Sequence, residues 1–174
     1  MSSDGPVVGL TNGYIYTFLK EQTRKASRKS PKFTDVYSAD MVPPSLLDDR
    51  QREYVCVCNL SESTERGTHF VTLHITPKTI KVYDSLALNL KLASPELERR
   101  LRTTRKTVRH AFQQPLQRLS SSMCGFYAIM FVLCLTYSPP QDLLEDFSYA
   151  ERSRNDERAV QNIKNVILWS NNKS

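Results

Sequence analysis

One cysteine in the chain stands at a position that favours a reactive thiol. Cys124 begins an apolar stretch, residues 124–131, directly after the polar residues 117–122 and Met123. The apolar stretch predicts a buried helix and the polar residues predict a loop, so the sulfur is expected in the first turn of the helix. Unpaired N–H groups and partial positive charge at a helix N-terminus lower the pKa of a thiol and favour the nucleophilic thiolate.

Two alternating segments upstream contain a histidine and a carboxylate that could serve this thiolate. Residues 69–76 and 79–86 predict two strands joined at Pro77-Lys78. If Thr76 pairs with Thr79, His69 and Asp84 are diagonal neighbours on one sheet face, and a slip by one residue would separate them. The same face would carry Val71, Leu73, Ile75, Ile80, Val82 and Leu86. We therefore expect the pair at the rim of an apolar surface.

This combination predicts nucleophilic attack on an acyl carbon. A carboxylate such as Asp84 fixes the tautomer of a neighbouring imidazole and favours its charged form. The imidazole of His69 would take the proton of Cys124 and later deliver it to a leaving amine. The Cys124 backbone N–H and the Gln117 side-chain amide are the expected donors to the oxyanion. Gly125 would let a substrate or loop backbone come close.

Each residue also has a purely structural explanation. A cysteine in an apolar helix is most often a core residue. His69 could be a partly buried histidine, and Asp84 could cap the end of a strand. His110, in a predicted strand, is an alternative base, whereas His74 has the opposite strand parity to His69 and should face away. Cys56, Cys58 and Cys134 are expected in the core.

Length and composition predict one domain, residues 1–174, with a sizeable core, because the chain is 40% hydrophobic. Four cysteines are too few for a disulfide scaffold, and their spacing does not favour zinc, so free thiols and no metal are expected. Residues 1–5 are unlike a signal peptide, and the longest apolar run, residues 128–135, is too short to cross a bilayer. We expect a soluble intracellular protein without membrane contact.

The net charge of +6 is concentrated in two basic clusters. The first cluster comprises Lys20, Arg24, Lys25, Arg28, Lys29 and Lys32, and the second comprises Arg99, Arg100, Arg102, Arg105, Lys106 and Arg109. Such clusters could bind DNA through its phosphates, or they could simply be solvated surface. No aromatic residues interleave with them, so base stacking is not indicated.

The remaining pattern predicts helices at both ends around a central group of strands, an α+β fold. Thr11 should cap a first helix with an apolar side formed by Tyr14, Phe18 and Leu19. The other expected elements are a loop to Pro31, irregular residues 41–50, a buried strand 54–60, a helix from Pro95 to about Lys106, a strand around 108–112, a helix 124–137 ended by Pro139-Pro140, a short helix 143–147, and an amphipathic helix around 159–167.

The order of these motifs resembles that of the adenovirus protease (adenain) and the related SUMO-specific proteases. The matching strings are Gly67-Thr68-His69-Phe70, Val82-Tyr83-Asp84-Ser85-Leu86, Gln117, and Cys124-Gly125-Phe126-Tyr127. The resemblance covers residues 54–137. It implies a papain-like fold with permuted chain order, with a central mixed sheet flanked by helices, and His69, Asp84, Gln117 and Cys124 as catalytic residues.

Three departures from the family pattern bear on these expectations. Phe70 stands where the family usually has Trp, and Asp84 replaces the glutamate of adenain, although SUMO proteases use Asp. The chain also lacks a cysteine where adenain pairs covalently with its activating peptide, which argues against that mode of activation. The basic clusters keep a DNA activator open.

The resemblance implies a monomeric cysteine endopeptidase that cleaves viral precursor proteins at small or glycine-containing sites, in the virion and the host cell nucleus. The chemistry needs no cofactor, while DNA and a peptide are the activators that the resemblance suggests. Three alternatives stay open: a protease that removes SUMO-type modifiers, an acetyltransferase with the same triad, and a basic nucleic-acid-binding or capsid protein with a coincidental motif.

Overall fold

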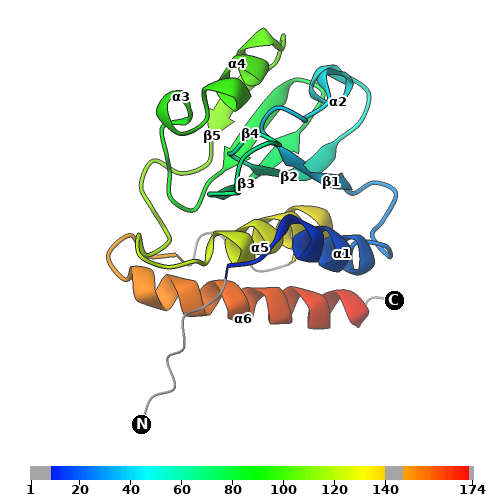
Figure 1. Cartoon of the computed structure of the whole chain (residues 1–174). Helices are drawn as coiled ribbons and strands as arrows, with labels where there is room; N and C mark the ends of the chain where they lie inside the picture. Colours follow the sequence, from blue (N-terminus) through cyan, green and yellow to red (C-terminus); the bar gives the residue numbers. More distant parts are fainter. Residues whose placement is uncertain (1–8, 140–146, 173–174) are drawn as a thin grey trace.

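The structure is built on one five-stranded mixed sheet (Figure 1). The computed structural model describes residues 9–139 and 147–172. The strands are β1 (Lys32–Ser38), β2 (Tyr54–Asn59), β3 (Phe70–Ile75), β4 (Thr79–Tyr83) and β5 (Thr107–His110), and they lie side by side in this order. The outer pairs β1–β2 and β4–β5 are parallel, and the inner pairs are antiparallel.

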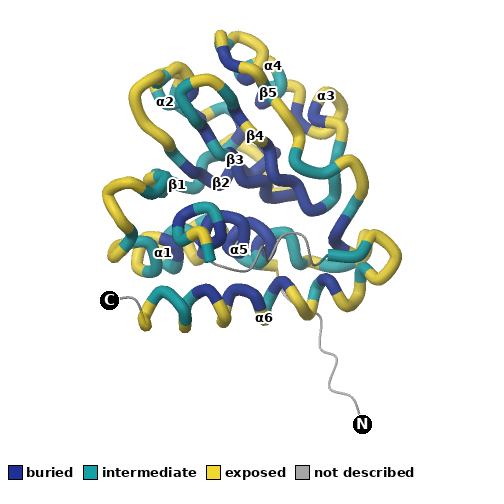
Figure 2. Tube along the Cα trace, turned by 180° about the vertical axis from the view of Figure 1, so that it is seen from behind, coloured by how far each residue is buried: buried dark blue, intermediate teal, exposed yellow. Residues whose placement is uncertain are grey.

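Helices cover both faces of the sheet, so that two apolar cores form (Figures 1 and 2). On one face lie α1 (Asn12–Gln22) and α5 (Cys124–Tyr137), with α6 (Arg152–Asn171) packed behind α5. On the other face lie α2 (Pro44–Asp48), α3 (Leu90–Ala93) and α4 (Pro95–Thr103). The predicted α+β class with a central mixed sheet is therefore confirmed.

The helix α5 has the bounds that its apolar sequence predicts. It is surrounded by protein, and Tyr127 and Phe131 are among the largest fully buried side chains of the chain. It ends where Ser138 adopts the left-handed backbone conformation (φ 45°) and donates its N–H to the Cys134 carbonyl. In the described part of the chain, neither α5 nor another helix has the length and apolar character that crossing a membrane requires.

The hairpin has the predicted register, but the predicted face is not the one that meets the cysteine helix. Leu73 pairs with Val82 and Ile75 with Ile80, as expected from a Thr76–Thr79 turn. These apolar residues pack against α2, α3 and α4, whereas Phe70 and Tyr83 face α5. His69 and Asp84 lie one residue beyond the strands, so strand parity no longer determines where their side chains point.

Several elements differ from the prediction. Three were missed: β1, whose alternation is interrupted by an irregularity between Phe33 and Val36, and the short helices α2 and α3. Thr11 does cap α1 by accepting the Tyr14 N–H, but the buried residues of α1 are Ile15 and Leu19, and Tyr14 is exposed. The helix α4 ends at Thr103, short of Lys106. The helix predicted at 143–147 falls largely outside the described residues.

A buried asparagine anchors the loop that leads into β3. The Asn59 Oδ1 atom accepts the backbone N–H groups of Ser61 (3.1 Å) and Thr68 (3.3 Å), and its Nδ2 atom donates to Asn12 Oδ1 (3.2 Å). Gly67 passes so close that an added Cβ would lie 2.2 Å from Asn59 Nδ2. The loop between β2 and β3 therefore depends on the absence of a side chain at residue 67.

Gly67→Ala should destabilise the protein by about 1–3 kcal/mol, because the new methyl group must displace a hydrogen-bonded, buried Asn59 side chain. Gly13→Ala is the matched control: it lies within α1, nothing lies within 4 Å of its added Cβ, and Ala should raise the free energy of unfolding by about 0.5–1 kcal/mol. Urea unfolding measures both variants. Equal effects of the two substitutions would contradict the packing described at Gly67.

Candidate functional site

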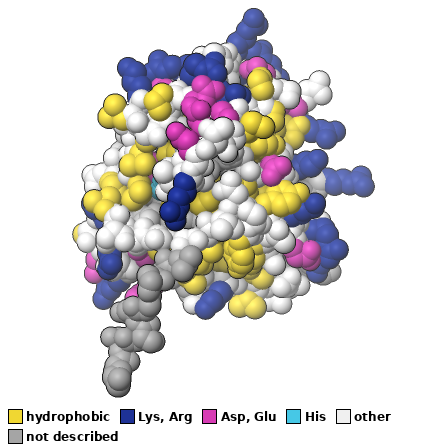
Figure 3. Space-filling model, in the orientation of Figure 1, with side chains coloured by type: hydrophobic (Ala, Val, Ile, Leu, Met, Phe, Trp, Pro, Cys, Tyr) yellow, Lys and Arg dark blue, Asp and Glu magenta, His cyan; other side chains and the backbone are white. Residues whose placement is uncertain are grey.

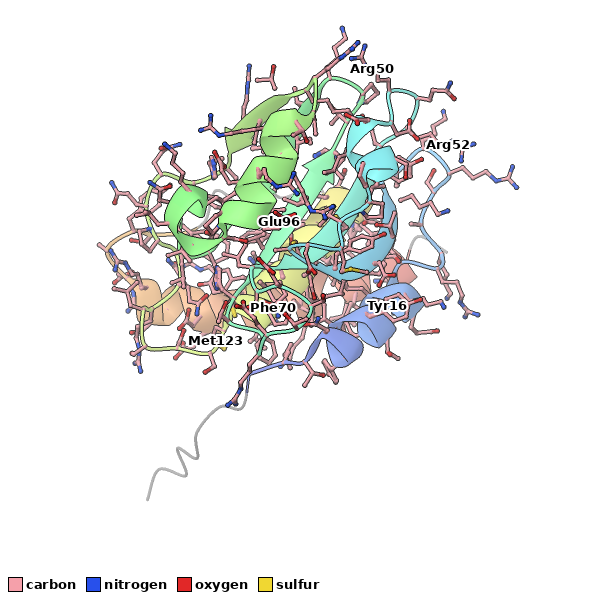
Figure 4. The ribbon with its side chains drawn as sticks, turned by 45° about the horizontal axis from the view of Figure 1, so that its top comes forward. Tyr16, Arg50, Arg52, Phe70, Glu96 and Met123 are labelled. Atoms are coloured by element: carbon pink, nitrogen blue, oxygen red, sulfur yellow. The ribbon has the colours of Figure 1, made fainter. Side chains whose placement is uncertain are left out.

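A pocket of about 750 Å³ opens where the loop before β3, the turn after β4 and the first turn of α5 meet. His69, Gln117 and Cys124 all line it. Its walls come from residues 9–12, from 61–68 and from 119–122. Figure 4 labels two neighbours of this place, Phe70 at the start of β3 and Met123 just before α5, which pack in the same core. Three of the four predicted site residues thus share one cavity wall.

The turn after β4 holds the Asp84 carboxylate in a fixed position. The Asp84 Oδ1 atom lies 2.6 Å from His69 Nε2 and also accepts the Leu86 N–H at 2.8 Å. The Oδ2 atom accepts the Leu88 N–H at 2.8 Å. Ala87 has a φ of 49°, a conformation that costs about 1–2 kcal/mol for an L-residue, and it closes this turn around the carboxylate. Asp84 therefore brings a buried, aligned acceptor to the histidine.

His69 links this carboxylate to the cysteine. Its side chain is buried, and its Nε2–H donates to Asp84, because a carboxylate can only accept. The other ring nitrogen, Nδ1, is then the one that meets the Cys124 sulfur. Burial alone would lower the pKa of His69, but the hydrogen bonds and charges of Asp84 and Cys124 outweigh it and raise the pKa to about 9. At neutral pH this imidazole is a cation.

Cys124 is partly exposed at the first position of α5. Burial tends to raise the pKa of its thiol, yet the hydrogen bond and positive charge of His69 lower that pKa, helped by the backbone N–H groups of Phe70 and Gly125. A raised histidine pKa beside a lowered thiol pKa favours the thiolate–imidazolium pair. The geometry thus supplies a nucleophile and an acid that are mutually stabilised.

Gln117 is buried with its side-chain amide held at both ends. Its Oε1 atom accepts the Ser85 hydroxyl at 2.7 Å, and its Nε2 atom donates to the Ser121 carbonyl at 2.7 Å. Nε2 carries a second hydrogen that this bond does not use. Because Gln117 lines the same pocket as Cys124, this hydrogen is available to a group bound there. The sequence alone gave no signal for the roles of Ser85 and Ser121.

Gly125 permits a close approach, as expected, but the neighbour is a side chain of the segment before α1. An added Cβ would lie 3.0 Å from Leu10 Cβ and 3.3 Å from Ile15 Cδ1. The first turn of α5 thus packs tightly against α1 and the residue that precedes its cap. This packing fixes the height of the cysteine above the sheet.

The other candidates lie away from the pocket. His74 is on β3, where its Nε2 atom lies 3.3 Å from Glu53 Oε2, and His110 is exposed at the end of β5. Burial raises the pKa of Cys56 to about 12 and that of Cys58 well above its ordinary value. Cys134 is buried in α5. Cys124 is thus the cysteine with a lowered thiol pKa.

Iodoacetamide should alkylate Cys124 ahead of the other three cysteines, with a rate that is already near its plateau below the ordinary thiol pKa of about 8.5. His69→Ala removes the cation that lowers the thiol pKa, so the rate at pH 7 should fall about tenfold or more. His74→Ala is the matched control and should change nothing. Mass spectrometry of the labelled peptides measures these rates across pH. Equal labelling of all four cysteines would contradict the ion pair.

Comparison with known proteins gives a structural match alone. No family model matches the sequence, and no curated protein matches it. Among solved structures, the fold is similar to AvrA, a YopJ-family acetyltransferase related to the CE-clan cysteine proteases, in a structure described as "AvrA delL154 with IP6, CoA". The TM-score is 0.47 at 18% identity, and the match covers 89% of this chain and 68% of AvrA. The fold therefore resembles that of CE-clan enzymes.

Proposed function

We propose that this chain is a cysteine-type hydrolase that cleaves amide bonds in proteins through Cys124. The observation that carries the proposal is the position of His69, with the Asp84 carboxylate at 2.6 Å on one side and the Cys124 thiol on the other. A neutral core histidine does not need a buried carboxylate and a lowered-pKa thiol at its two nitrogens. The pocket gives a substrate access to the sulfur.

The reaction would proceed in two halves. The Cys124 Sγ attacks the carbonyl carbon, and the carbon–nitrogen bond then breaks while His69 Nδ1 delivers its proton to the leaving amine. A water molecule next gives a proton to His69 and attacks the thioester carbon, so the carbon–sulfur bond breaks and the thiolate re-forms. Asp84 keeps the imidazole oriented and stabilises its charge through both halves.

Both halves pass through an oxyanion that needs hydrogen-bond donors. The unused hydrogen on Gln117 Nε2 and the backbone N–H of Cys124, which lies in the first turn of α5 and has no helical partner, are the donors we assign. Both belong to the same pocket wall. This supports Gln117 as the residue that stabilises the developing negative charge.

The substrate is proposed to be an extended polypeptide with small residues at the cleavage site. The walls formed by residues 9–12 and 61–68 border the sulfur from two sides, and Phe70 and Leu86 add apolar surface beside His69. The preference for glycine and for viral precursors comes from the sequence resemblance. SUMO-type deconjugation and acetyl transfer would use the same three side chains, so the choice of substrate separates these activities.

The purified chain should cleave a glycine-rich peptide library, and Cys124→Ala should abolish cleavage. Asp84→Asn keeps the shape of the side chain but removes its charge, so kcat should fall on the order of a thousandfold. Ubiquitin and SUMO conjugates, and acetyl-coenzyme A with acceptor peptides, are tested in parallel. Turnover of conjugates or of acetyl-coenzyme A alone would replace the endopeptidase with one of those activities. Turnover that survives Cys124→Ala would contradict the proposal altogether.

A second function, nucleic-acid binding by the first basic cluster, is favoured by a different observation. Lys20, Arg24, Arg28, Lys29 and Lys32, together with Arg52, line a pocket of about 820 Å³ between α1, the segment that follows it, and the segment before β2. Figure 3 shows Lys and Arg side chains gathered on this side, and Figure 4 labels Arg52 and Tyr16 there. A concave surface with several cations suits a phosphate backbone.

Two aromatic rings accompany these cations, which the sequence pattern did not indicate. Tyr16 and Phe33 both line the pocket, with ring centroids 6.4 Å apart, and Lys20 Nζ lies 5.2 Å from the Tyr16 centroid. They were missed because Tyr16 precedes the cluster and Phe33 follows it. Their presence adds a surface on which a base could stack.

The second basic cluster is largely neutralised by its own helix and its neighbours. Arg99 and Arg100 each lie 2.7 Å from Glu96, which Figure 4 labels on α4, and Arg102 lies 2.6 Å from Glu98. Lys106 is buried and donates to the Asp49 carbonyl. These contacts support α4 as a solvated, ion-paired helix and leave the first cluster as the candidate phosphate site.

Arg28→Gln/Lys29→Gln should weaken binding of a short DNA duplex about tenfold and flatten the dependence of log Kd on log salt by roughly two charges. Arg99→Gln/Arg102→Gln removes the same charge from the second cluster and should leave binding within about twofold. Fluorescence anisotropy across salt concentrations measures both. Equal losses in the two double variants, or binding indifferent to salt, would remove this function.

A further inference from the structure

The residue after Asp84 has a hydroxyl group that the reaction outlined above does not use. We propose that Ser85 is a positioning residue that orients and polarises the Gln117 amide as an oxyanion donor; this inference rests on the proposed hydrolase function. Ser85 is 1% exposed, and its Oγ atom lies 2.7 Å from Gln117 Oε1. Two consecutive residues at the end of β4 would thus serve the two halves of the site, Asp84 through His69 and Ser85 through Gln117.

The direction of these hydrogen bonds follows from the chemistry of the partners. The Ser121 carbonyl can only accept, so the atom of Gln117 that faces it must be the Nε2 donor. The Oε1 atom then faces Ser85, and because an amide oxygen cannot donate, the Ser85 hydroxyl must. The bond therefore runs from Ser85 Oγ–H to Gln117 Oε1.

A donor on the amide oxygen affects the nitrogen of the same group. It draws electron density toward Oε1 and makes the Nε2 hydrogens more positive, so each becomes a better donor to an oxyanion. It also resists rotation of the amide away from the pocket. Without the hydroxyl, Oε1 would be a buried acceptor that has lost its partner, and the amide would turn to find another.

The backbone around Gln117 is held by groups other than this hydroxyl. The backbone N–H groups of Leu116 and Gln117 both donate to the Ser85 carbonyl, at 2.8 and 3.0 Å. From α6, Asn155 Nδ2 donates to the Leu116 carbonyl at 3.0 Å, and Asp156 Oδ1 accepts the Arg118 N–H at 3.4 Å. Ser85→Ala keeps every one of these bonds. The substitution should therefore change the amide side chain while the loop stays in place.

A double-mutant cycle in kcat tests this coupling. Gln117→Ala should lower kcat about a hundredfold, as expected for the loss of an oxyanion donor. Ser85→Ala should lower it about tenfold with little change in KM, and it should have no further effect once Gln117 is Ala. Alkylation of Cys124 by iodoacetamide should stay within twofold in Ser85→Ala, because that reaction forms no oxyanion.

Ser94→Ala is the matched control for the loss of a buried hydroxyl. Ser94 is 3% exposed, and its Oγ atom donates to the Leu60 carbonyl at 2.7 Å, on the sheet face opposite α5. It should lower the midpoint of thermal unfolding about as much as Ser85→Ala, while kcat stays within twofold. Equal losses of kcat in the two variants would assign Ser85 a purely structural effect and overturn the proposal.

A spectroscopic readout separates this inference from the proposed function. Ser85→Ala should shift the Gln117 side-chain NH2 signals in a ¹⁵N–¹H NMR spectrum and speed their exchange with water, with Gln117→Ala identifying the signals. Unchanged signals, or losses of kcat that multiply in the double variant, would overturn the role of Ser85 in an active enzyme. A wild-type chain that hydrolyses no substrate would instead overturn the proposed function and with it the catalytic part of this inference.

Discussion

The structure depends on a charged imidazole that is shared between a carboxylate and a thiol in a mostly buried place. Removing such a cation from water is unfavourable, and burial by itself would push the pKa of His69 down. The Asp84 carboxylate at 2.6 Å and the Cys124 sulfur outweigh this effect. Removing one partner would leave the others buried without compensation, so the three groups act as one electrostatic unit.

The fold brings this unit together at the ends of its elements. His69 precedes β3, Asp84 follows β4, and Cys124 begins α5, so none of the three is constrained by the pleat of a strand or the middle of a helix. Rigid parts hold these ends: the hairpin register, the turn that encloses Asp84, and the packing of Gly125 against Leu10. The result is a precise arrangement on rigid supports that still opens onto a pocket.

Much of this arrangement could be predicted from local patterns. The alternation around Thr76 and Thr79 gave the hairpin register, and the change from polar to apolar residues at Cys124 gave the start of α5. The side on which His69 meets the thiol could not be predicted, because parity ends with the strand. Strand β1 was missed since its alternation is interrupted, and the Ser85–Gln117 contact joins residues far apart in the chain. Tyr16 and Phe33 flank the first basic cluster only in three dimensions.

The most direct measurement of the central claim is an NMR titration of the His69 imidazole in the wild-type chain and in Cys124→Ala. The account predicts that His69 stays protonated at pH 7.5 in the wild type, with a pKa near 9. It also predicts that this pKa falls when the sulfur is removed, because the thiolate no longer stabilises the cation. A His69 that titrates near its ordinary value of about 6.5 in both proteins would contradict it.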